Sequence, residues 1–267
     1  YGEAVLGAGS GFVYSIAPVV FINNTSGTTS KTYDGTTVAS LTGGQLVGVV
    51  ATDSSSINLV QSGTFASANA GTAVIVSANN ALAGSAAANY VLTQPTSLSA
   101  NITAAPVTIS GLTASNKVYD TTTAATLTGT SEIAGGLLGS DTATLSGTAT
   151  AGTFASANVG NAIAVTANLS SLSLSNANYY VAGVTSPLSA NITPAPVTIS
   201  GLTASNKVYD TTTAATLVGT KTVAGLLSTD TSTVSGNTTA TFASADAGSA
   251  IGVAVNVSGL TLSNANY

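Results

Sequence analysis

The sequence lacks five of the residue types that most often carry chemistry. Its 267 residues include no His, Cys, Met, Trp or Arg. Proton transfer near neutral pH is the usual task of histidine, and a nucleophilic serine or threonine needs a base beside it. The composition therefore argues against an enzyme, and we identify no catalytic, cofactor-binding or metal-binding residues.

Charge is almost as scarce as these residue types. Lys and Arg together number 4, Asp and Glu number 9, and the formal net charge is -5. Four lysines spread over the whole length form no basic patch that could neutralise a phosphate backbone, so we expect no nucleic-acid partner. The absence of cysteine fits a reduced cytosol and also an exported chain that forms no disulfides.

Long hydrophobic runs are missing as well. The longest is about "IAPVVFI" at 16 to 22, whereas a helix that spans a bilayer needs about 20 consecutive apolar residues. We therefore expect no membrane-spanning segment. No signal-peptide pattern opens the chain, and the absence of methionine indicates a processed or internal piece of a longer protein.

Internal repeats organise the sequence. The segment "APVTISGLTASNKVYDTTTAATL" at 105 to 127 returns unchanged at 195 to 217, which is 90 residues later. "TFASAN" at 64 to 69 returns at 153 to 158 and, as "TFASAD", at 241 to 246. This period is several times longer than that of a β-helix coil or a small solenoid repeat. Each repeat is thus large enough to be a small domain.

The local patterns within a repeat are those of β-strands. Val, Ile, Thr and Tyr alternate with small polar residues at 107 to 114, 142 to 147, 162 to 170 and 179 to 186, a period of two that indicates strands. Clusters of Gly, Asn, Asp and Ser between them favour turns. We predict an all-β fold: an elongated or filamentous tandem array of small Ig-like β-sandwich repeats of about 90 residues.

The repeats set the expected domain boundaries. Residues 1–16 would be the closing strands of a preceding repeat, 17–103 repeat 1, 104–193 repeat 2, and 194–267 an incomplete repeat 3. Each boundary lies near an Ala-Pro pair, at Ala17, Ala105 and Ala195. Because proline fixes its own φ and restricts the residue before it, we expect these junctions to be short, stiff linkers.

The few large side chains are predicted to fill the cores. A domain of this size buries only about 60 to 65% of its unfolded surface, and aromatic residues are the default anchors. We expect one set in each repeat to pack together: Tyr33, Phe65 and Tyr90; Tyr119, Phe154 and Tyr179; Tyr209, Phe242 and Tyr267. A pocket of exposed aromatics is the alternative.

A charged motif occurs once in each repeat, as "SKTYDGTT" and twice as "NKVYDTTT". It comprises Lys31, Tyr33 and Asp34, Lys117, Tyr119 and Asp120, and Lys207, Tyr209 and Asp210. Lys and Asp are three residues apart on an extended segment, so they should not share one face. The simplest interpretation is a turn in which Asp caps the backbone and Lys is solvated. The alternative is a charged pair that marks a ligand site.

A second acidic series comprises Asp53, Asp141 and Asp230, each after an apolar or glycine-rich stretch. Repeated carboxylates near domain junctions can bind calcium. A calcium site usually needs several carboxylates together, however, and no D-x-[DN]-x-[DN]-G loop occurs here. Turn formation is the favoured interpretation of this series.

Three motifs in fixed order carry a resemblance to a known family. The "K-[TV]-Y-D-[GT]-T-T" opening, the "TFASANVG" middle and the "Asn-Tyr … SANIT … APV" close resemble the YDG-type repeats of large bacterial surface adhesins related to filamentous haemagglutinin. The resemblance covers 17 to 267. One departure is that Thr121 and Thr211 replace the family's glycine, which Gly35 keeps; this argues against a role that needs a left-handed backbone there.

The resemblance implies secretion, an extracellular location at the cell surface, and a role without enzymatic activity or cofactors. In one hypothesis the repeats are a stalk or filament in cell attachment and biofilm matrix, and their partners are neighbouring copies or further repeats of the same chain. In the other hypothesis each repeat is a lectin-like module that binds matrix polysaccharide or another cell surface. Burial of the tyrosines would favour the first.

The spacing of tyrosines predicts how repeats continue. Tyr1, Tyr90, Tyr179 and Tyr267 follow one another at intervals of 89, 89 and 88 residues, so the sequence starts and stops at the same phase. Either it belongs to a longer covalent array, which the missing methionine favours, or residues 1–16 of one molecule complete the last repeat of another by strand addition.

Overall fold

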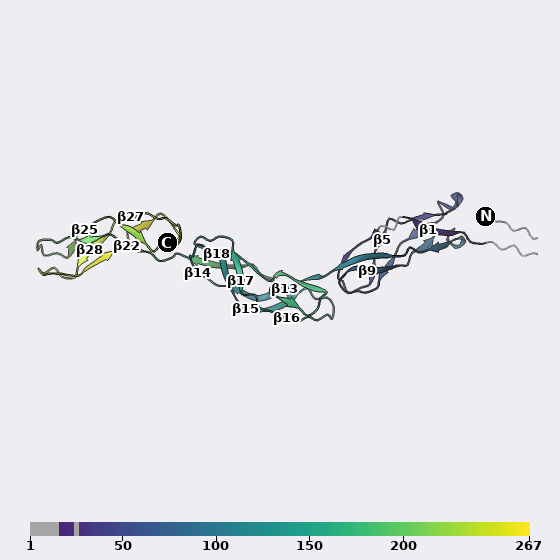
Figure 1. Cartoon of the computed structure of the whole chain (residues 1–267), viewed down its shortest axis with the longest axis horizontal. Coiled ribbons are helices and arrows are strands. Elements are labelled where there is room, and N and C mark those ends of the chain that lie inside the picture. The colour runs from purple at the N-terminus through teal and green to yellow at the C-terminus, as the bar shows by residue number, and fades with distance from the viewer. Residues whose placement is uncertain (1–15, 24–26) are drawn as a thin grey trace, which may run out of the picture. The chain divides into compact units, whose positions relative to one another are not determined.

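The computed structural model describes residues 16–23 and 27–267. Within these residues the chain consists of short β-strands, and its only helices are two 3-10 turns, η1 (Ala51–Asp53) and η2 (Ala87–Asn89). No helix of the described residues is long and apolar enough to cross a membrane. The prediction of an all-β chain is confirmed (Figure 1).

Each sequence repeat folds as two lobes, which we call A and B and number by repeat. Lobe A1 contains a three-stranded sheet in the order β11-β1-β6 and the pair β7-β10. Its strands are β1 (Val19–Asn23), β6 (Gln45–Val47), β7 (Asn58–Val60), β10 (Ala81–Ala83) and β11 (Val91–Thr93). Lobe A1 thus joins the start, middle and end of repeat 1.

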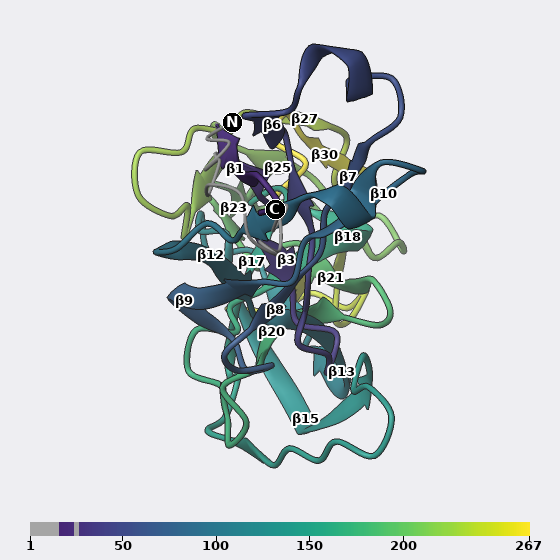
Figure 2. The same ribbon diagram turned by 90° about the vertical axis from the view of Figure 1, so that its right-hand side faces the viewer.

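Lobe B1 carries the charged motif on a five-stranded sheet in the order β3-β12-β9-β8-β4. Figure 2 labels β3, β8, β9 and β12 of this lobe. Lobe B1 also contains the separate pair β2-β5. The strands of lobe B1 are β2 (Gly27–Thr28), β3 (Lys31–Thr32), β4 (Val38–Ala39), β5 (Leu41–Thr42), β8 (Gly63–Phe65), β9 (Gly71–Ala78) and β12 (Leu98–Thr103). β12 runs antiparallel to β9 and parallel to β3. Its buried and exposed residues alternate, as a strand with one face on a core requires.

Repeat 2 has the same two lobes. Lobe B2 repeats the strand order of lobe B1 as β14-β21-β18-β17-β15, and the same sheet continues as β15-β13-β20 in lobe A2. The strands of repeat 2 are β13 (Ala105–Ala114), β14 (Lys117–Val118), β15 (Ala124–Gly135), β16 (Leu145–Ser146), β17 (Ala151–Phe154), β18 (Gly160–Ala167), β19 (Ser173–Leu174), β20 (Tyr179–Val184) and β21 (Leu188–Thr193). The strands predicted from alternation correspond to β13, β16, β18 and β20.

Repeat 3 has fewer strands in its lobes. In lobe A3, β22 pairs with β26 and β27 with β30; in lobe B3 the sheet is β24-β28-β29, beside the pair β23-β25. Its strands are β22 (Thr198–Ser200), β23 (Thr203–Ala204), β24 (Ala214–Ala215), β25 (Leu217–Val218), β26 (Thr222–Ala224), β27 (Val234–Gly236), β28 (Thr239–Phe242), β29 (Val253–Asn256) and β30 (Leu260–Leu262).

The compact units of the structure are shifted against the sequence repeats. Unit 1 combines repeat 1 with lobe A2. This unit consists of residues up to Thr108 together with 133–146 and 173–182. Unit 2 combines lobe B2 with repeat 3. The boundary falls inside β13, β15 and β20. Lobe B of one repeat therefore packs with lobe A of the next repeat inside one unit.

The core of unit 1 shows this shift residue by residue. One cluster contains Tyr33 and Phe65 of repeat 1 together with Tyr179 of repeat 2, whereas Tyr90 lies in a separate cluster with Val20. The expectation that the three aromatic residues of one repeat share a core is therefore wrong. Tyr179 belongs to lobe A2, and it packs on lobe B1 of the preceding repeat.

The Ala-Pro segments are also not linkers. Ala105 begins β13 and is buried, and Ala195 is buried as well. The backbone N–H of Ala105 donates to the carbonyl oxygen of Asn178 at 2.8 Å, and that of Ala195 to Asn266 at 2.9 Å. Ala105 and Pro106 are the first residues of β13, whereas Ala195-Pro196 and Ala17-Pro18 lie just before β22 and β1.

Candidate functional site

The charged motif folds into a closed turn in lobe B1. Asp34 Oδ1 accepts hydrogen bonds from the backbone N–H and the hydroxyl of Thr36, both at 2.8 Å. Lys31 Nζ donates to Asp34 Oδ1, to the carbonyl oxygen of Thr36 and to its hydroxyl. The ammonium group has three protons, so all of its donors are used. The Asp part of the prediction fits this geometry, since the carboxylate caps the backbone of the turn.

The expected solvation of the lysine is wrong in all three repeats. The Lys–Asp distances are 2.7, 2.6 and 2.7 Å, and the lysine side chains are only 18, 17 and 25% exposed. The chain reverses direction after Asp, so the extended geometry assumed from the spacing does not apply. Each ammonium also lies 5.5 to 5.6 Å from the ring centroid of Phe65, Phe154 or Phe242, within cation–π range.

Hydrogen bonds in this turn change the acidity of its carboxylates. The pKa of Asp34 falls to about 2, chiefly because Lys31 donates to it, and the pKa of Asp210 falls to about 2 because of Lys207. Burial raises the pKa of Asp120, but the hydrogen bonds from Lys117 and Thr122 and the charge of Lys117 together outweigh burial, and the net shift is downward. The three turns therefore stay ionised well into the acid range.

The residue after Asp is left-handed in every repeat. Gly35 has φ +75°, Thr121 +68° and Thr211 +65°. The expectation that threonine would exclude this conformation is wrong. A β-branched residue in this region is strained, but the bonds of Asp and Lys to the next threonine fix the turn on both sides.

The tyrosine of the first two charged motifs is bound by the following repeat. In unit 1, the hydroxyls of Tyr33 and Tyr179 both donate to Asp141 Oδ2, at 2.7 and 2.6 Å. The two rings meet edge to face with their centroids 5.4 Å apart. Leu138 N–H in turn donates to the Tyr179 hydroxyl. We call this Tyr–Asp–Tyr group the junction cluster.

The same junction cluster recurs in unit 2. The hydroxyls of Tyr119 and Tyr267 donate to Asp230 Oδ2 at 2.7 and 2.8 Å, and their rings are 5.5 Å apart, again edge to face. Leu227 N–H donates to the Tyr267 hydroxyl. In both clusters the first tyrosine belongs to lobe B of one repeat, and the other two residues belong to lobe A of the next.

Shared hydrogen bonds shift the acidity of the junction cluster. The bond to Asp141 raises the pKa of Tyr33 above its usual 10.0, and burial adds to this. The bond to Asp230 does the same for Tyr119. The pKa of Asp141 is lowered, first by the Tyr179 hydroxyl and then by that of Tyr33. The cluster thus holds its charged carboxylate and neutral phenols over a wide pH range.

An asparagine makes a second bond across each junction. In unit 1, Asn178 Oδ1 accepts from Ala70 N–H at 2.8 Å and Asn178 Nδ2 donates to Asn69 Oδ1 at 3.1 Å. In unit 2, Asn266 bonds in the same way to Val159 N–H and Asn158. The last asparagine of the "TFASAN" motif in one repeat is therefore hydrogen-bonded to the asparagine of the "Asn-Tyr" motif in the next repeat.

The third copy of the motif differs in its surroundings. Tyr33 and Tyr119 are 8 and 6% exposed, but Tyr209 is 59% exposed. Phe242 and Tyr267 are half-buried, whereas Phe65, Phe154, Tyr90 and Tyr179 are buried. The expectation of a buried core position does not hold for Tyr209.

The second acidic series combines a turn with a side-chain acceptor. The N–H groups of Asp53, Asp141 and Asp230 each donate to a carbonyl oxygen three residues earlier, as turn formation predicts. Asp53 Oδ2 accepts from the Tyr90 hydroxyl at 2.9 Å. In the described part of the chain no three acidic side chains lie close enough together to hold a metal ion. The carboxylates are bound by tyrosine instead.

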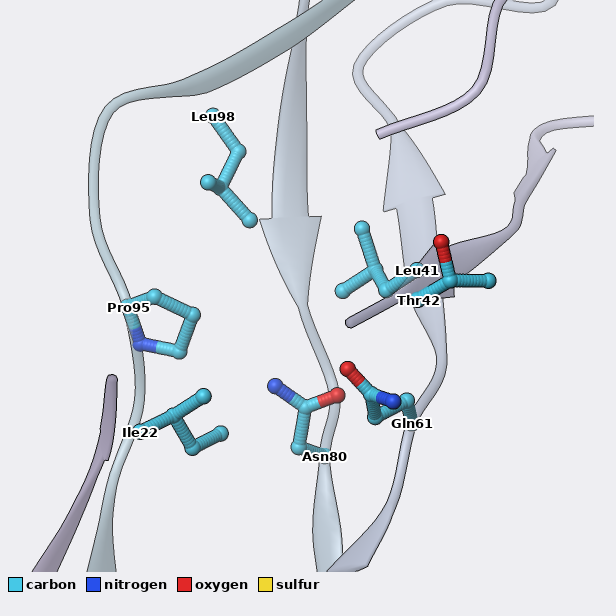
Figure 3. A pocket seen from close by; sticks show the side chains of 7 residues that line it. All are labelled: Ile22, Leu41, Thr42, Gln61, Asn80, Pro95 and Leu98. Atoms are coloured by element: carbon cyan, nitrogen blue, oxygen red, sulfur yellow. The ribbon is translucent and has the colours of Figure 1, made fainter. Parts of the chain in front are cut away.

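A small pocket lies beside lobe B1 in unit 1 (Figure 3). Its volume is about 10 Å³, enough for about one water molecule. Gln61 Oε1 accepts from Gly44 N–H and Asn80 Oδ1 from Ser62 N–H, so these amides already serve the fold. The residues around it are Ile22, Leu41, Thr42, Gln61, Asn80, Pro95 and Leu98. This pocket is too small for a sugar or a cofactor.

Sequence reasoning found the members of the junction cluster but not the cluster. The tyrosines and aspartates were identified as separate series, and each was placed in its own repeat. The signal was their common phase: Tyr33, Asp141 and Tyr179 are matched by Tyr119, Asp230 and Tyr267 at nearly constant offsets. Pairing across repeats follows only when the two lobes are known.

Comparison with known proteins agrees with the repeat structure. The YDG domain family matches the chain three times, at residues 18–97, 103–186 and 193–267. No curated protein and no solved structure matches the chain. The matched segments cover most of the sequence, one per repeat and each with one charged motif, so the chain belongs to the YDG domain family.

Proposed function

We propose that this chain is a structural repeat segment of a secreted bacterial adhesin or extracellular fibre, acting as a stalk or filament in cell attachment and in the biofilm matrix. Its location would be extracellular, at the cell surface. The proposal includes the finer fold, an elongated array of Ig-like β-sandwiches. Its partners would be further repeats or neighbouring copies, and it would have no enzymatic activity.

The observation that carries this proposal is the junction cluster. Tyr33 and Tyr119 are the aromatic residues of the repeated motif, and both are buried with their hydroxyls bonded to an aspartate of the next repeat. A ligand-binding module keeps such groups open to solvent. Here the most repeated side chains are used to join one repeat to the next, which is a mechanical task.

The charged turn supports the same interpretation. Lys31 Nζ donates three hydrogen bonds to Asp34 and Thr36 and lies over the ring of Phe65. No donor of that ammonium is left for a ligand. The motif that gives the family its regularity thus stabilises lobe B internally, and near-identity between repeats is expected when every repeat has the same structural role.

Polysaccharide binding remains the second candidate because two tyrosines are open. Tyr180 is 52% and Tyr209 59% exposed, and sugar sites commonly use exposed aromatic faces. The pocket beside lobe B1 includes neither of them. We therefore rank this function below the structural one.

Force spectroscopy on the 267-residue chain tests the proposal. We expect Tyr33→Phe to lower the force at which unit 1 unfolds, because it removes a bond across a junction. Tyr209→Phe is the matched control and should leave the force unchanged. Polysaccharide microarrays with the wild type, Tyr180→Ala and Tyr209→Ala test the alternative. Binding lost in either alanine variant, with unchanged force in Tyr33→Phe, would overturn the structural function.

A further inference from the structure

Repeat 1 has a polar side chain in its interior where the other repeats have an apolar one. Asn80 is 8% exposed, and it is the one buried polar residue among those that the structure describes. Counted from the "TFASA" motif at 64, 153 and 241, the position of Asn80 is occupied by Leu169 in repeat 2 and by Val257 in repeat 3. A buried amide needs hydrogen-bond partners, so Asn80 has a requirement that the aliphatic residues do not have.

The hydrogen bonds of Asn80 fix the orientation of its side chain. Its backbone N–H donates to Gln94 Oε1 at 3.1 Å, and its carbonyl oxygen accepts from Gln94 Nε2 at 2.7 Å. Its side-chain Oδ1 accepts from Ser62 N–H at 3.1 Å. Because that partner is a donor, the amide oxygen has to face it, and the Nδ2 group faces the other way. Within the described residues, Nδ2 donates to no protein atom.

This amide nitrogen borders the pocket drawn in Figure 3. In that view the nitrogen of Asn80 points toward Pro95, whereas its oxygen points toward Gln61. The volume of the pocket is about 10 Å³, which is the space of one water molecule. A buried donor without a partner is destabilising. The pocket is therefore the place where Nδ2 should find an acceptor.

The pocket lies where the chain passes between lobes A1 and B1. Ile22 belongs to β1 of lobe A1, whereas Leu41 and Leu98 belong to β5 and β12 of lobe B1. Gln61 and Asn80 stand in the short connections from β7 to β8 and from β9 to β10, each of which joins one lobe to the other. Both lobes belong to unit 1. An occupant of the pocket would thus contact both lobes at once.

The polar groups around the pocket favour an occupant that both accepts and donates a hydrogen bond. Asn80 Nδ2 offers a proton. Gln61 Oε1 accepts from Gly44 N–H at 2.8 Å and keeps a second lone pair. None of the residues that line the pocket is charged, so an ion would be buried without a counter-ion, which is unfavourable. Water meets both requirements and fits the volume.

We propose that repeat 1 binds one water molecule in this pocket as a structural ligand, which accepts a hydrogen bond from Asn80 Nδ2 and donates one to Gln61 Oε1. The water joins lobe A1 to lobe B1 through the two connections that carry these amides. Repeat 2 has Leu169 and Thr150 at the equivalent positions, so it lacks both amides and should bind no water there. The inference concerns the interior of one repeat and does not rest on the proposed function.

A high-resolution crystal structure of the 267-residue chain tests the site directly. We expect one fully occupied water oxygen at about 2.7 to 3.2 Å from both Asn80 Nδ2 and Gln61 Oε1. An empty pocket, an ion in place of the water, or an Asn80 amide that bonds to a protein atom instead would each overturn the proposal.

Nuclear Overhauser effects between water and protein test the same site in solution. A water that stays in the pocket longer than the protein takes to tumble should give such an effect at the side-chain amide of Asn80 and at the methyl groups of Leu98. Asn80→Leu, which introduces the residue of repeat 2, should abolish the effect at Leu98, and so should Gln61→Leu. The matched control is Asn79→Ala, because Asn79 is exposed and its amide bonds to Thr64 Oγ1.

The control should keep the effect at Leu98 unchanged. An effect that persists in Asn80→Leu, or one that is lost equally in Asn79→Ala, would contradict the proposal. If Asn80→Leu does not fold, the wild type and Gln61→Leu still decide, since absence of the effect in the first or its persistence in the second would refute the site.

Discussion

Lobes B2 and B3 contain the same motif sequence but differ in what covers it. The stretch "NKVYDTTTAATL" is identical in the two lobes, and its Lys–Asp turn has the same geometry in both. Tyr119 is nevertheless buried and Tyr209 exposed. The turn therefore forms from local sequence, whereas the core around the tyrosine forms only when strand β21 and the following lobe A are beside it.

The largest expected effect separates the phenylalanines of these two lobes. Phe154 is 2% exposed, so we expect Phe154→Ala to cost about 3 to 5 kcal/mol of unfolding free energy. Phe242 is half-buried, and Phe242→Ala should cost about half as much. Hydrogen exchange resolved by peptide measures both losses in unit 2. Equal losses would show that the two lobes are equally well packed.

The pH dependence of stability tests the Lys–Asp turn, which lobes B1, B2 and B3 all contain. The pKa of Asp34 and of Asp210 lies at about 2 instead of 3.8. A lowered pKa in the folded state adds stability above pH 3.8 that is lost as the pH falls through about 2. We expect a flat unfolding midpoint above about pH 5 and a fall below pH 4. Asp210→Asn should reduce that fall, and a profile that stays flat to pH 2 would refute this account.

A smaller effect is expected from the tyrosine hydroxyls. Tyr119→Phe removes the bond to Asp230, and we expect the melting temperature of unit 2 to fall by about 2 to 4 °C. Tyr209→Phe is the matched control in the same motif and should melt like the wild type. Calorimetry measures both. A similar fall in both variants would show that burial does not distinguish the two tyrosines.

The smallest effect compares lobe B2 with lobe B1. Thr121 and Gly35 occupy the same left-handed position, and a Cβ on Gly35 would meet no atom within 4 Å. The strain of the left-handed backbone should therefore determine the change in unfolding free energy. We expect Thr121→Gly to raise the unfolding free energy and Gly35→Thr to lower it, each by about 0.5 to 1 kcal/mol. Denaturant titration gives the sign. Destabilisation by Thr121→Gly would mean that its side chain has another role.

Local features of the fold followed from the sequence. Strands β13, β18 and β20 were predicted from alternation, and the caps of Asp34, Asp120 and Asp210 from turn chemistry. These features depend on residues that are close in the chain. The pattern of "LSANIT", with Leu98, Ala100 and Ile102 inward, likewise fits its single buried face.

Non-local features did not follow from the sequence. A period of about 90 residues fixes where each motif recurs but not whether Tyr179 packs on its own repeat or on the preceding one. Both arrangements bury the same side chains with the same spacing. Which arrangement forms is decided by contacts between residues about 100 positions apart in the sequence, such as Tyr33 with Asp141, and not by any one motif. The junction cluster is the product of these contacts.

The offset between sequence repeat and compact unit also bears on how the length of such a chain can change. Tyr33 and Tyr119 meet partners of the same type at the same positions, so the two junctions that the structure describes are interchangeable. Loss or gain of one whole period by recombination would join lobe B to a lobe A that fits it. A deletion of any other length would separate a tyrosine from its aspartate. The number of repeats can therefore change in whole periods, while the contacts between repeats stay the same.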